Sequence, residues 1–288
     1  MVSIAIPSKN EIFLQKTILD VLEKAKGEIE VFPILDGYEP LESELVDDPR
    51  VHYVRLEKTD YSKKRHGINK VVNEHATGKY VCWMDGHVMV APGFDEVLVR
   101  DHIENRVQVP RRNRLDAENW CLQQQSDARP PIDYEHFLWK GLIESKEMHG
   151  FRNDRRTLER MEIEVDKILT CQGSFFFMGR DWFKKCSFMD IAYQGWGSEA
   201  EEVCFQTYFM GGEVVVNKKT WYAHLHKGSK YGRMYHLSKD EIRRSYRYSW
   251  NNWAVERQDF FISQLERFAP FPNYPVDWKN QLISRLKT

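Results

Sequence analysis

Short apolar runs and amphipathic stretches alternate along the first hundred residues. Periodicity predicts one helix over 11–25, with Ile12, Ile18, Leu19 and Leu22 on one face, and a second over 67–74. The apolar runs predict strands at 2–6, 31–35, 51–56 and 80–84. Strands that alternate with helices form a mostly parallel sheet with helices on both faces, so this half of the chain is predicted to be α/β.

The pattern changes after residue 100 and returns near residue 170. Residues 101–168 are rich in arginine, glutamine and proline and are predicted to form an irregular insertion, although several aromatic residues argue against simple disorder. Regular structure is predicted again as strands at 174–178, 214–216 and 221–224 and a helix at 198–209. The last fifty residues are amphipathic and are predicted to be a helical C-terminal extension.

Composition and charge place few limits on function. The chain has 288 residues and a net charge of -1, so nothing global favours nucleic acid or an anionic membrane. Its five cysteines are scattered and include no C-x-x-C pair, which is typical of reduced thiols in the cytosol. Met1 leads directly into the first strand and no apolar stretch has the length of a membrane span, so we expect a cytoplasmic protein.

Polar side chains follow three of the predicted strands. The first strand ends at Pro7-Ser8-Lys9-Asn10, the second at Asp36 and the fourth at Asp85-Gly86-His87. In sheets of this class ligands bind beyond the carboxyl ends of the strands. An acid and an imidazole one residue apart suit a divalent metal that carries a diphosphate, whereas an Asp-Gly turn without chemistry is the alternative interpretation.

These strand ends, together with later motifs, carry a resemblance to a known family. The motifs are Val2–Glu11, Ile34–Gly37, Arg65–Asn69, Asp85-Gly86-His87, Gln172–Phe176, Gly195-Trp196-Gly197-Ser198-Glu199, Gly211-Gly212 and Trp221–His224. Their order resembles family-2-type glycosyltransferases of the GT-A fold, and Asp-x-His with Gly-Trp-Gly-x-Glu resembles the polypeptide N-acetylgalactosaminyltransferases. The resemblance covers residues 2–100 and 170–227. It implies a Rossmann-like, mostly parallel sheet that binds a UDP-sugar.

The same resemblance implies a division of the chain. Residues 1–100 would form the nucleotide-sugar-binding half of the GT-A domain, and residues 169–228 the half that carries the acceptor and metal sites. Residues 101–168 would form an acceptor-side insertion, and residues 229–288 the helical extension.

A metal site is predicted at Asp85, His87 and His224. A divalent cation would stabilise the charge that builds on the diphosphate as the glycosidic bond breaks. One carboxylate and two imidazoles favour Mn²⁺ or a similar transition metal, with Mg²⁺ as the alternative. His226 competes with His224 for the same role.

Further residues are predicted to hold the donor and the acceptor. Pro7, Ser8 and Asn10 would contact the nucleotide-sugar, and Asp36 would accept the uracil imino group unless it only starts a turn. Arg65 would reach the diphosphate or the base unless it is a solvated arginine at the start of a helix. Lys227 and Tyr231 lie on a glycine-hinged basic loop that could close over the diphosphate. Trp196 and Glu199 are the predicted catalytic residues. Trp196 offers a plate for a sugar face unless it only packs in the core, and Glu199 could accept hydrogen bonds from hydroxyl groups unless it only serves the helix dipole.

One position departs from the family pattern. Inverting enzymes of this type usually follow the glutamate with an aspartate that deprotonates the acceptor, whereas Ala200 stands here. This substitution favours a retaining mechanism, although Glu199, Glu201 or Glu202 could supply a base.

The acceptor is open. Basic residues interleaved with aromatics at 243–253 suit phosphate contacts and base stacking, which would fit hydroxymethylated DNA as in phage-type DNA glycosylation. A solvated amphipathic helix with its aromatics in the core explains the same pattern. A protein or glycan acceptor is the alternative, and a non-catalytic nucleotide-sugar-binding protein is an alternative of another class. A sugar nucleotidyltransferase is disfavoured because the first turn lacks a glycine-rich phosphate loop.

Overall fold

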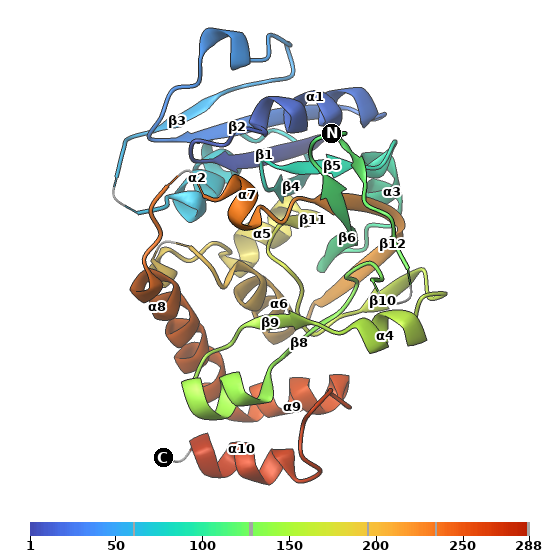
Figure 1. The fold of residues 1–288 in the computed structure, drawn as a ribbon, viewed down its shortest axis with the longest axis vertical. Coiled ribbons are helices and arrows are strands. Elements are labelled where there is room, and N and C mark those ends of the chain that lie inside the picture. The colour runs from blue at the N-terminus through green and yellow to red at the C-terminus, as the bar shows by residue number, and fades with distance from the viewer. Residues whose placement is uncertain (60, 127–128, 195, 234, 287–288) are drawn as a thin grey trace.

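A computed structural model describes residues 1–59, 61–126, 129–194, 196–233 and 235–286. Within these ranges ten strands form one mixed sheet, whose main path has the order β10-β12-β6-β11-β4-β1-β2-β3, while β5 pairs with β12 and β7 with β6. A separate two-stranded ribbon joins β8 and β9. Helices pack on both faces of the large sheet, as predicted (Figure 1).

The first half of the sheet follows the sequence prediction closely. It contains β1 (Val2–Ser8), β2 (Ile29–Asp36), β3 (Val54–Leu56) and β4 (Tyr80–Met84). β1 lies between β2 and β4, and all of these pairings are parallel. Nearly every residue of β1, β2 and β4 is buried, which explains why these strands read as continuous apolar runs.

Strands of both directions complete the sheet on the other side of β4, where β11 is antiparallel to β4 and to β6, and β6 is parallel to β12. β11 (Phe175–Gly179) pairs with β4, and β12 (Glu213–His224) replaces the two short strands predicted at 214–216 and 221–224. A register shift between Asn217 and Trp221 marks the point where the sequence pattern is interrupted. The remaining strands apart from β6 are β5 (Val88–Val90), β7 (Cys121–Leu122), β8 (Glu135–Phe137), β9 (Gly150–Arg152) and β10 (Val165–Lys167).

The expectation of irregular structure after residue 100 is wrong for β6 (Arg106–Asp116). This strand lies inside the sheet, between β12 and β11. Its arginines can lie inside the sheet because the following segment supplies partners for their charges. Asp133 binds Arg111, and Glu135 lies 3.6 Å from Arg112. The carbonyl of Pro130 accepts a hydrogen bond from Arg114. Arginines in a strand need such partners when they are buried, and the sequence pattern does not reveal them.

The helices follow the predicted positions with small shifts. α1 (Leu14–Lys24) and α2 (Lys64–Lys70) fill the first two connections, and α2 continues as a π-helical turn, η2 (Val71–His75). α6 (Glu199–Phe209) packs on β12 and β6. The other helices here are α3 (Phe94–Arg100), α4 (Asp154–Glu159), α5 (Arg180–Cys186) and α7 (Gly228–Tyr231), with short turns η1 (Glu42–Glu44), η3 (Gly141–Ser145) and η4 (Ile191–Tyr193).

The C-terminal extension is helical, as predicted. It comprises α8 (Lys239–Trp250), η5 (Asn251–Val255), α9 (Gln258–Phe268) and α10 (Trp278–Leu286), which occupy the lower part of Figure 1. Trp250 and Trp253 are buried, and Trp253 packs against Phe205 of α6 and Phe260 of α9. The tryptophans of this basic and aromatic segment are therefore core residues. None of the helices in the described ranges is long and apolar enough to cross a membrane.

Candidate metal and nucleotide-sugar site

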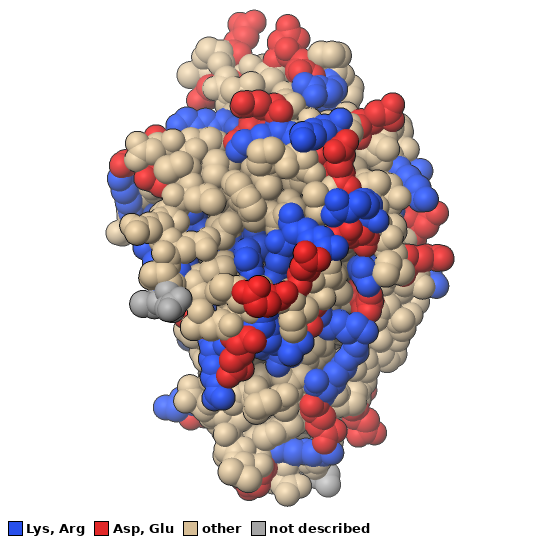
Figure 2. Space-filling view, turned by 90° about the vertical axis from the view of Figure 1, so that its right-hand side faces the viewer, with Lys and Arg blue, Asp and Glu red and all other residues tan. Residues whose placement is uncertain are grey.

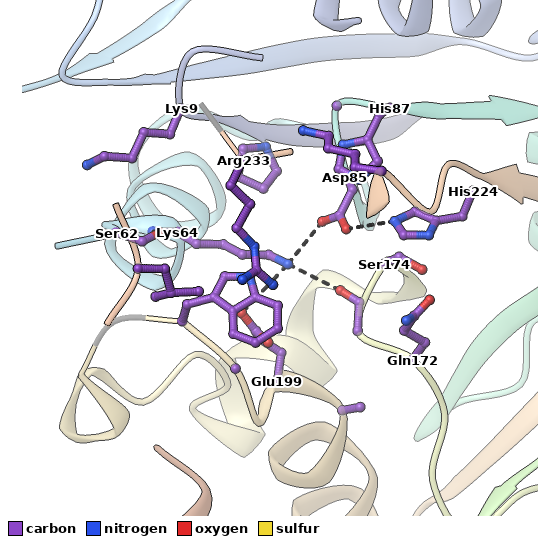
Figure 3. Close-up of a pocket in the computed structure, with 18 of the residues that line it drawn as sticks. Lys9, Ser62, Lys64, Asp85, His87, Gln172, Ser174, Glu199, His224 and Arg233 are labelled. Atoms are coloured by element: carbon purple, nitrogen blue, oxygen red, sulfur yellow. Dashed lines mark hydrogen bonds and ion pairs between the residues drawn. The ribbon is translucent and has the colours of Figure 1, made fainter. Parts of the chain in front are cut away.

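A cavity of about 860 Å³ lies beyond the carboxyl ends of β1 and β4 and beside the end of β12. Its lining includes most of the predicted site residues: Pro7, Ser8, Asp85, His87, Trp196, Glu199, His224, His226 and Lys227. Asn10, Asp36, Arg65 and Tyr231 are not in the lining. Figure 3 shows Asp85, His87 and His224 in this cavity, with Lys64 and Glu199 below them.

The three predicted metal ligands are brought together by strand pairing. Asp85 follows β4, and His87 immediately precedes β5, which runs antiparallel to the end of β12 with Val88 opposite His224. One ligand atom from each of Asp85, His87 and His224 lies within 4.8 Å of the others, and His224 Nε2 is 3.3 Å from Asp85 Oδ2. His226 lies nearby, but its ring is hydrogen-bonded to Arg112, so His224 fits the metal position better.

Glu11 supports this group from behind. It accepts a hydrogen bond from His87 Nδ1 over 2.9 Å and also binds Lys227. The bond fixes the ring of His87 and leaves its Nε2 for a metal ion, as carboxylates do behind many metal-bound histidines. Burial alone would raise the pKa of Glu11, but His87 and Lys227 hold it below its ordinary value. The donor set therefore fits a divalent transition metal.

Burial sets the protonation of His224. Removal from water lowers the pKa of His224 to about 3, so the ring is neutral near pH 7, the form that binds metals. Burial by itself would raise the pKa of Asp85, but the charge of Lys64 outweighs it and keeps that pKa well below its usual range. A neutral imidazole and a carboxylate thus face each other.

Lys64 is a site residue that the sequence analysis did not single out. Its Nζ donates to Asp85 Oδ1 over 3.0 Å and to the carbonyl of Gly173 over 3.2 Å, and it lies 3.6 Å from Glu199 Oε1. Despite burial, these two carboxylates raise its pKa above the ordinary value. A fixed ammonium beside the metal group is well placed to neutralise phosphate charge.

Arg65, the neighbour of Lys64, lies elsewhere. It is 2% exposed, pairs with Glu202, donates to the carbonyl of Gly197 over 2.9 Å and stacks on Tyr193. In this arrangement its guanidinium has buried acceptors of its own and does not face the cavity.

Of the other residues predicted to bind the sugar donor, some line the cavity and some do not. Pro7 and Ser8 line the cavity. Asp36 is buried at the end of β2, where Oδ2 accepts from Lys9 and from the backbone of Lys63, while Oδ1 has no protein partner among the described residues. That free acceptor suits an imino group. Asn10 lies at the exposed turn after β1.

Of the two residues predicted on the loop after β12, only Lys227 lines the cavity. Lys227 lines the cavity through its position beside Glu11, whereas the ring of Tyr231 packs edge-on against Phe13 at 5.3 Å. Arg233, farther along, reaches the cavity, and its guanidinium lies 4.5 Å from the ring centre of Trp196.

The predicted Gly195–Glu199 motif forms the opposite wall, except that Gly195 lies outside the described residues. Trp196 is half-buried, and Glu199 is buried at the start of α6 with its carboxylate toward Lys64 (Figure 3). Ala200, next to Glu199, presents no base.

Two further carboxyl groups line the cavity beyond Glu199. Glu201 Oε1 accepts from the backbone of Gly150 over 3.1 Å, and a side chain at Gly150 would meet Glu135 Oε2 at 2.5 Å. Gly150 thus lies between the two acids. Burial raises the pKa of Glu201 to about 8. Sequence analysis named Glu201 as a possible base, but it missed Glu135, which lies far away in the chain.

The chain is similar in sequence to known N-acetylgalactosaminyltransferases. The chain is 21% identical over 269 residues to Polypeptide N-acetylgalactosaminyltransferase 8 of Drosophila melanogaster. The matched region covers 89% of this chain and 43% of that protein. It is 24% identical over 160 residues to Probable N-acetylgalactosaminyltransferase 7 of Caenorhabditis elegans, covering 54% of this chain and 26% of that protein. The chain therefore spans less than half the length of these curated relatives.

A solved structure and a family model complete the comparison. The crystal structure of GalNAc-T7 with UDP, GalNAc and Mn²⁺ superimposes with a TM-score of 0.70 at 16% identity, covering all of this chain and 55% of that one, which supports the predicted α/β GT-A fold. The family model described as Glycosyl transferase family 2 matches residues 3–187. With most of the chain matched by that model, the protein belongs to glycosyl transferase family 2.

Proposed function

We propose that this chain is a metal-dependent glycosyltransferase that moves a sugar from a UDP-sugar to a hydroxyl group of an acceptor. The observation that carries the proposal is the group of Asp85, His87 and His224 inside a cavity large enough for a nucleotide-sugar. Support comes from the family and from GalNAc-T7, a protein of the same fold solved with UDP and Mn²⁺.

The side chains have distinct roles in this proposal. Asp85, His87 and His224 hold the metal, which supplies Lewis-acid stabilisation of the departing diphosphate. Lys64 adds a positive charge next to that group, and the free Oδ1 of Asp36, which is buried beside Lys9 of the cavity lining, is the acceptor proposed for the uracil imino group. Trp196 and Glu199 contact the sugar or the acceptor from the facing wall.

Release of UDP tests the proposal. The chain is incubated with UDP-glucose, UDP-galactose and UDP-N-acetylhexosamines in the presence of Mn²⁺, and free UDP is measured. We expect release with at least one donor, abolished by EDTA and reduced at least 100-fold in H224A. H66A, which changes an exposed histidine outside the cavity lining, serves as the matched control. Saturable UDP binding without release from any donor would instead identify a non-catalytic binding protein.

The stereochemical course is part of the proposal. Ala200 removes the usual acceptor base, so we expect the anomeric configuration of the donor to be retained. NMR of the first sugar released, before mutarotation, distinguishes the two outcomes, and an inverted anomer would exclude retention.

Hydroxymethylated DNA is the acceptor that we propose to test first. The exposed Arg243, Arg244 and Arg247 of α8 supply cationic side chains, although the adjoining tryptophans are buried. Transfer to an oligonucleotide that carries 5-hydroxymethylcytosine would appear as the mass of one hexose or N-acetylhexosamine. A mass shift on a protein or glycan, and none on DNA, would favour the alternative acceptors. A cytoplasmic location stays a prediction.

A further inference from the structure

A second cavity lies at the opposite end of the sheet from the metal group. Its volume is about 370 Å³, and it is formed where four segments far apart in sequence meet: the start of β6, the stretch from α4 to β10, the start of β12 and the end of α9. Figure 2 views the edge of the molecule where α4 and β10 lie, and Lys and Arg side chains lie there interspersed with Asp and Glu around the middle of that face.

The two cavities are well separated. Glu213 begins the 12-residue strand β12 and lines the second cavity, whereas His224 ends the same strand in the first. At the usual rise of a strand these positions are roughly 35 Å apart. A ligand in the second cavity therefore cannot be part of the donor bound near Asp85.

The charges in this cavity do not balance. Five cationic side chains line it (Arg106, Arg156, Arg160, Lys167 and Arg267) against two carboxylates, Asp166 and Glu213. Both carboxylates already have partners. Arg160 binds Asp166 over 2.5 and 3.0 Å, while Arg106 and Lys167 share Glu213 at 2.7 and 2.9 Å.

Arg156 and Arg267 carry the surplus charge. Among the described residues neither has a carboxylate within ion-pair distance. Arg156 donates to the carbonyl of Phe268 over 3.0 Å, and the two guanidinium groups lie 6.0 and 5.3 Å from the ring centre of Phe268. Burial and the charge of Arg160 lower the pKa of Arg156, although Asp166 and Glu159 act in the opposite direction.

From this surplus of positive charge we infer that the second cavity binds a phosphate group with at least two negative charges, as on a phosphomonoester or a diphosphate. Guanidinium forks match the oxygen geometry of phosphate and bind it in bidentate fashion. A single carboxylate would leave much of the positive charge uncompensated, whereas a diphosphate would offset it. The cavity is large enough for such a group and too small for a whole nucleotide-sugar, which needs a site of the size of the first cavity.

Calorimetry with pyrophosphate tests the inference. The titration is done in EDTA, so that no metal draws pyrophosphate to the first cavity, and without UDP, whose own diphosphate would compete for the second. We expect one binding event in the wild type, weakened at least tenfold in R156A/R267A. R155A is the matched control, since Arg155 is the next residue on α4, is 80% exposed and does not line the cavity. R156K/R267K keeps the charges without the forks and should lie between the two.

Further probes identify the source of the phosphate. Inorganic phosphate should compete with pyrophosphate, whereas a dT oligonucleotide without terminal phosphate should compete weakly because each phosphodiester carries a single charge. Strong competition by the oligonucleotide would show that the site binds a nucleic-acid backbone and would overturn the inference. No binding in the wild type, or equal binding in R156A/R267A, would overturn it as well. Circular dichroism and UDP release confirm that each variant is folded.

Discussion

The ring of His87 is oriented for the proposed metal site by a hydrogen bond to another residue. Its Nδ1 is bonded to Glu11, a residue of the first turn, which orients the ring toward Asp85 and His224. Acids behind metal-bound histidines fix the tautomer and raise the basicity of the ligand. Glu11 is therefore a positioning residue for the proposed metal.

Substitution of Glu11 tests that role. E11Q should weaken the apparent affinity for Mn²⁺ about 10- to 100-fold, because the neutral amide supports the imidazole less well. The dependence of UDP release on Mn²⁺ concentration measures this effect. A change in maximal rate at unchanged Mn²⁺ affinity would contradict a positioning role.

Glu201 gives the fold a pH dependence of its own. The pKa of Glu201 is about 8 in the folded state, where burial disfavours the charge, against 4.5 for an ordinary glutamate. The folded chain thus holds this proton more tightly than the unfolded chain does. Stability from Glu201 is full at low pH and is lost as the pH rises from about 4.5 through about 8.

The variant E201Q should remove that loss of stability, because glutamine does not titrate. Its amide oxygen can still accept the hydrogen bond from the backbone of Gly150. The melting temperature of E201Q relative to the wild type should therefore increase between pH 5 and pH 8.5. The control E162Q changes an exposed glutamate and should show no such trend. A difference that is constant with pH would contradict a shifted Glu201.

At the scale of elements, α2 separates two neighbouring cations. Successive residues of a helix point about 100° apart, so Lys64 faces the cavity while Arg65 is buried against Glu202 and Gly197. The sequence shows two adjacent basic residues but not the rotation of the helix. The sequence alone therefore does not distinguish Lys64, which faces the cavity, from Arg65, which does not.

Loss of Arg65 should mainly affect stability. R65M leaves Glu202 as a buried charge without its partner and should cost about 3–5 kcal/mol in the free energy of unfolding. The double variant R65M/E202M should recover much of that loss, whereas R155M at the exposed Arg155–Glu159 pair should change it by less than about 1 kcal/mol. Urea unfolding measures all three, and an R65M cost as small as that of R155M would contradict the buried pair.

Strands were predictable where burial was uniform. β1, β2 and β4 read as apolar runs, and the Asp85-Gly86-His87 turn was placed correctly because it interrupts one of them. β6 was missed because its arginines find partners in the segment near Asp133 and Glu135, a contact between distant parts of the chain. Local patterns carry no information about such pairings.

At the scale of the whole molecule, the site is assembled from distant parts of the chain. The pairing of β5 with β12 places His224 beside His87, 137 positions earlier in the numbering, and α6 brings Glu199 to Lys64. The resemblance to known transferases predicted these ligands, but only the sheet order explains why they meet. Trp253 and Phe261 bind the C-terminal extension to the same core through Phe205.

The central claim, that Asp85, His87 and His224 hold a metal bound together with UDP, is tested most directly by electron paramagnetic resonance of Mn²⁺. We predict that the wild-type chain removes one equivalent of free Mn²⁺ from solution and does so more tightly when UDP is present. H87A and H224A should each weaken this binding at least tenfold, whereas H66A should not. Equal Mn²⁺ binding by all four proteins, or no effect of UDP on the wild type, would contradict the account.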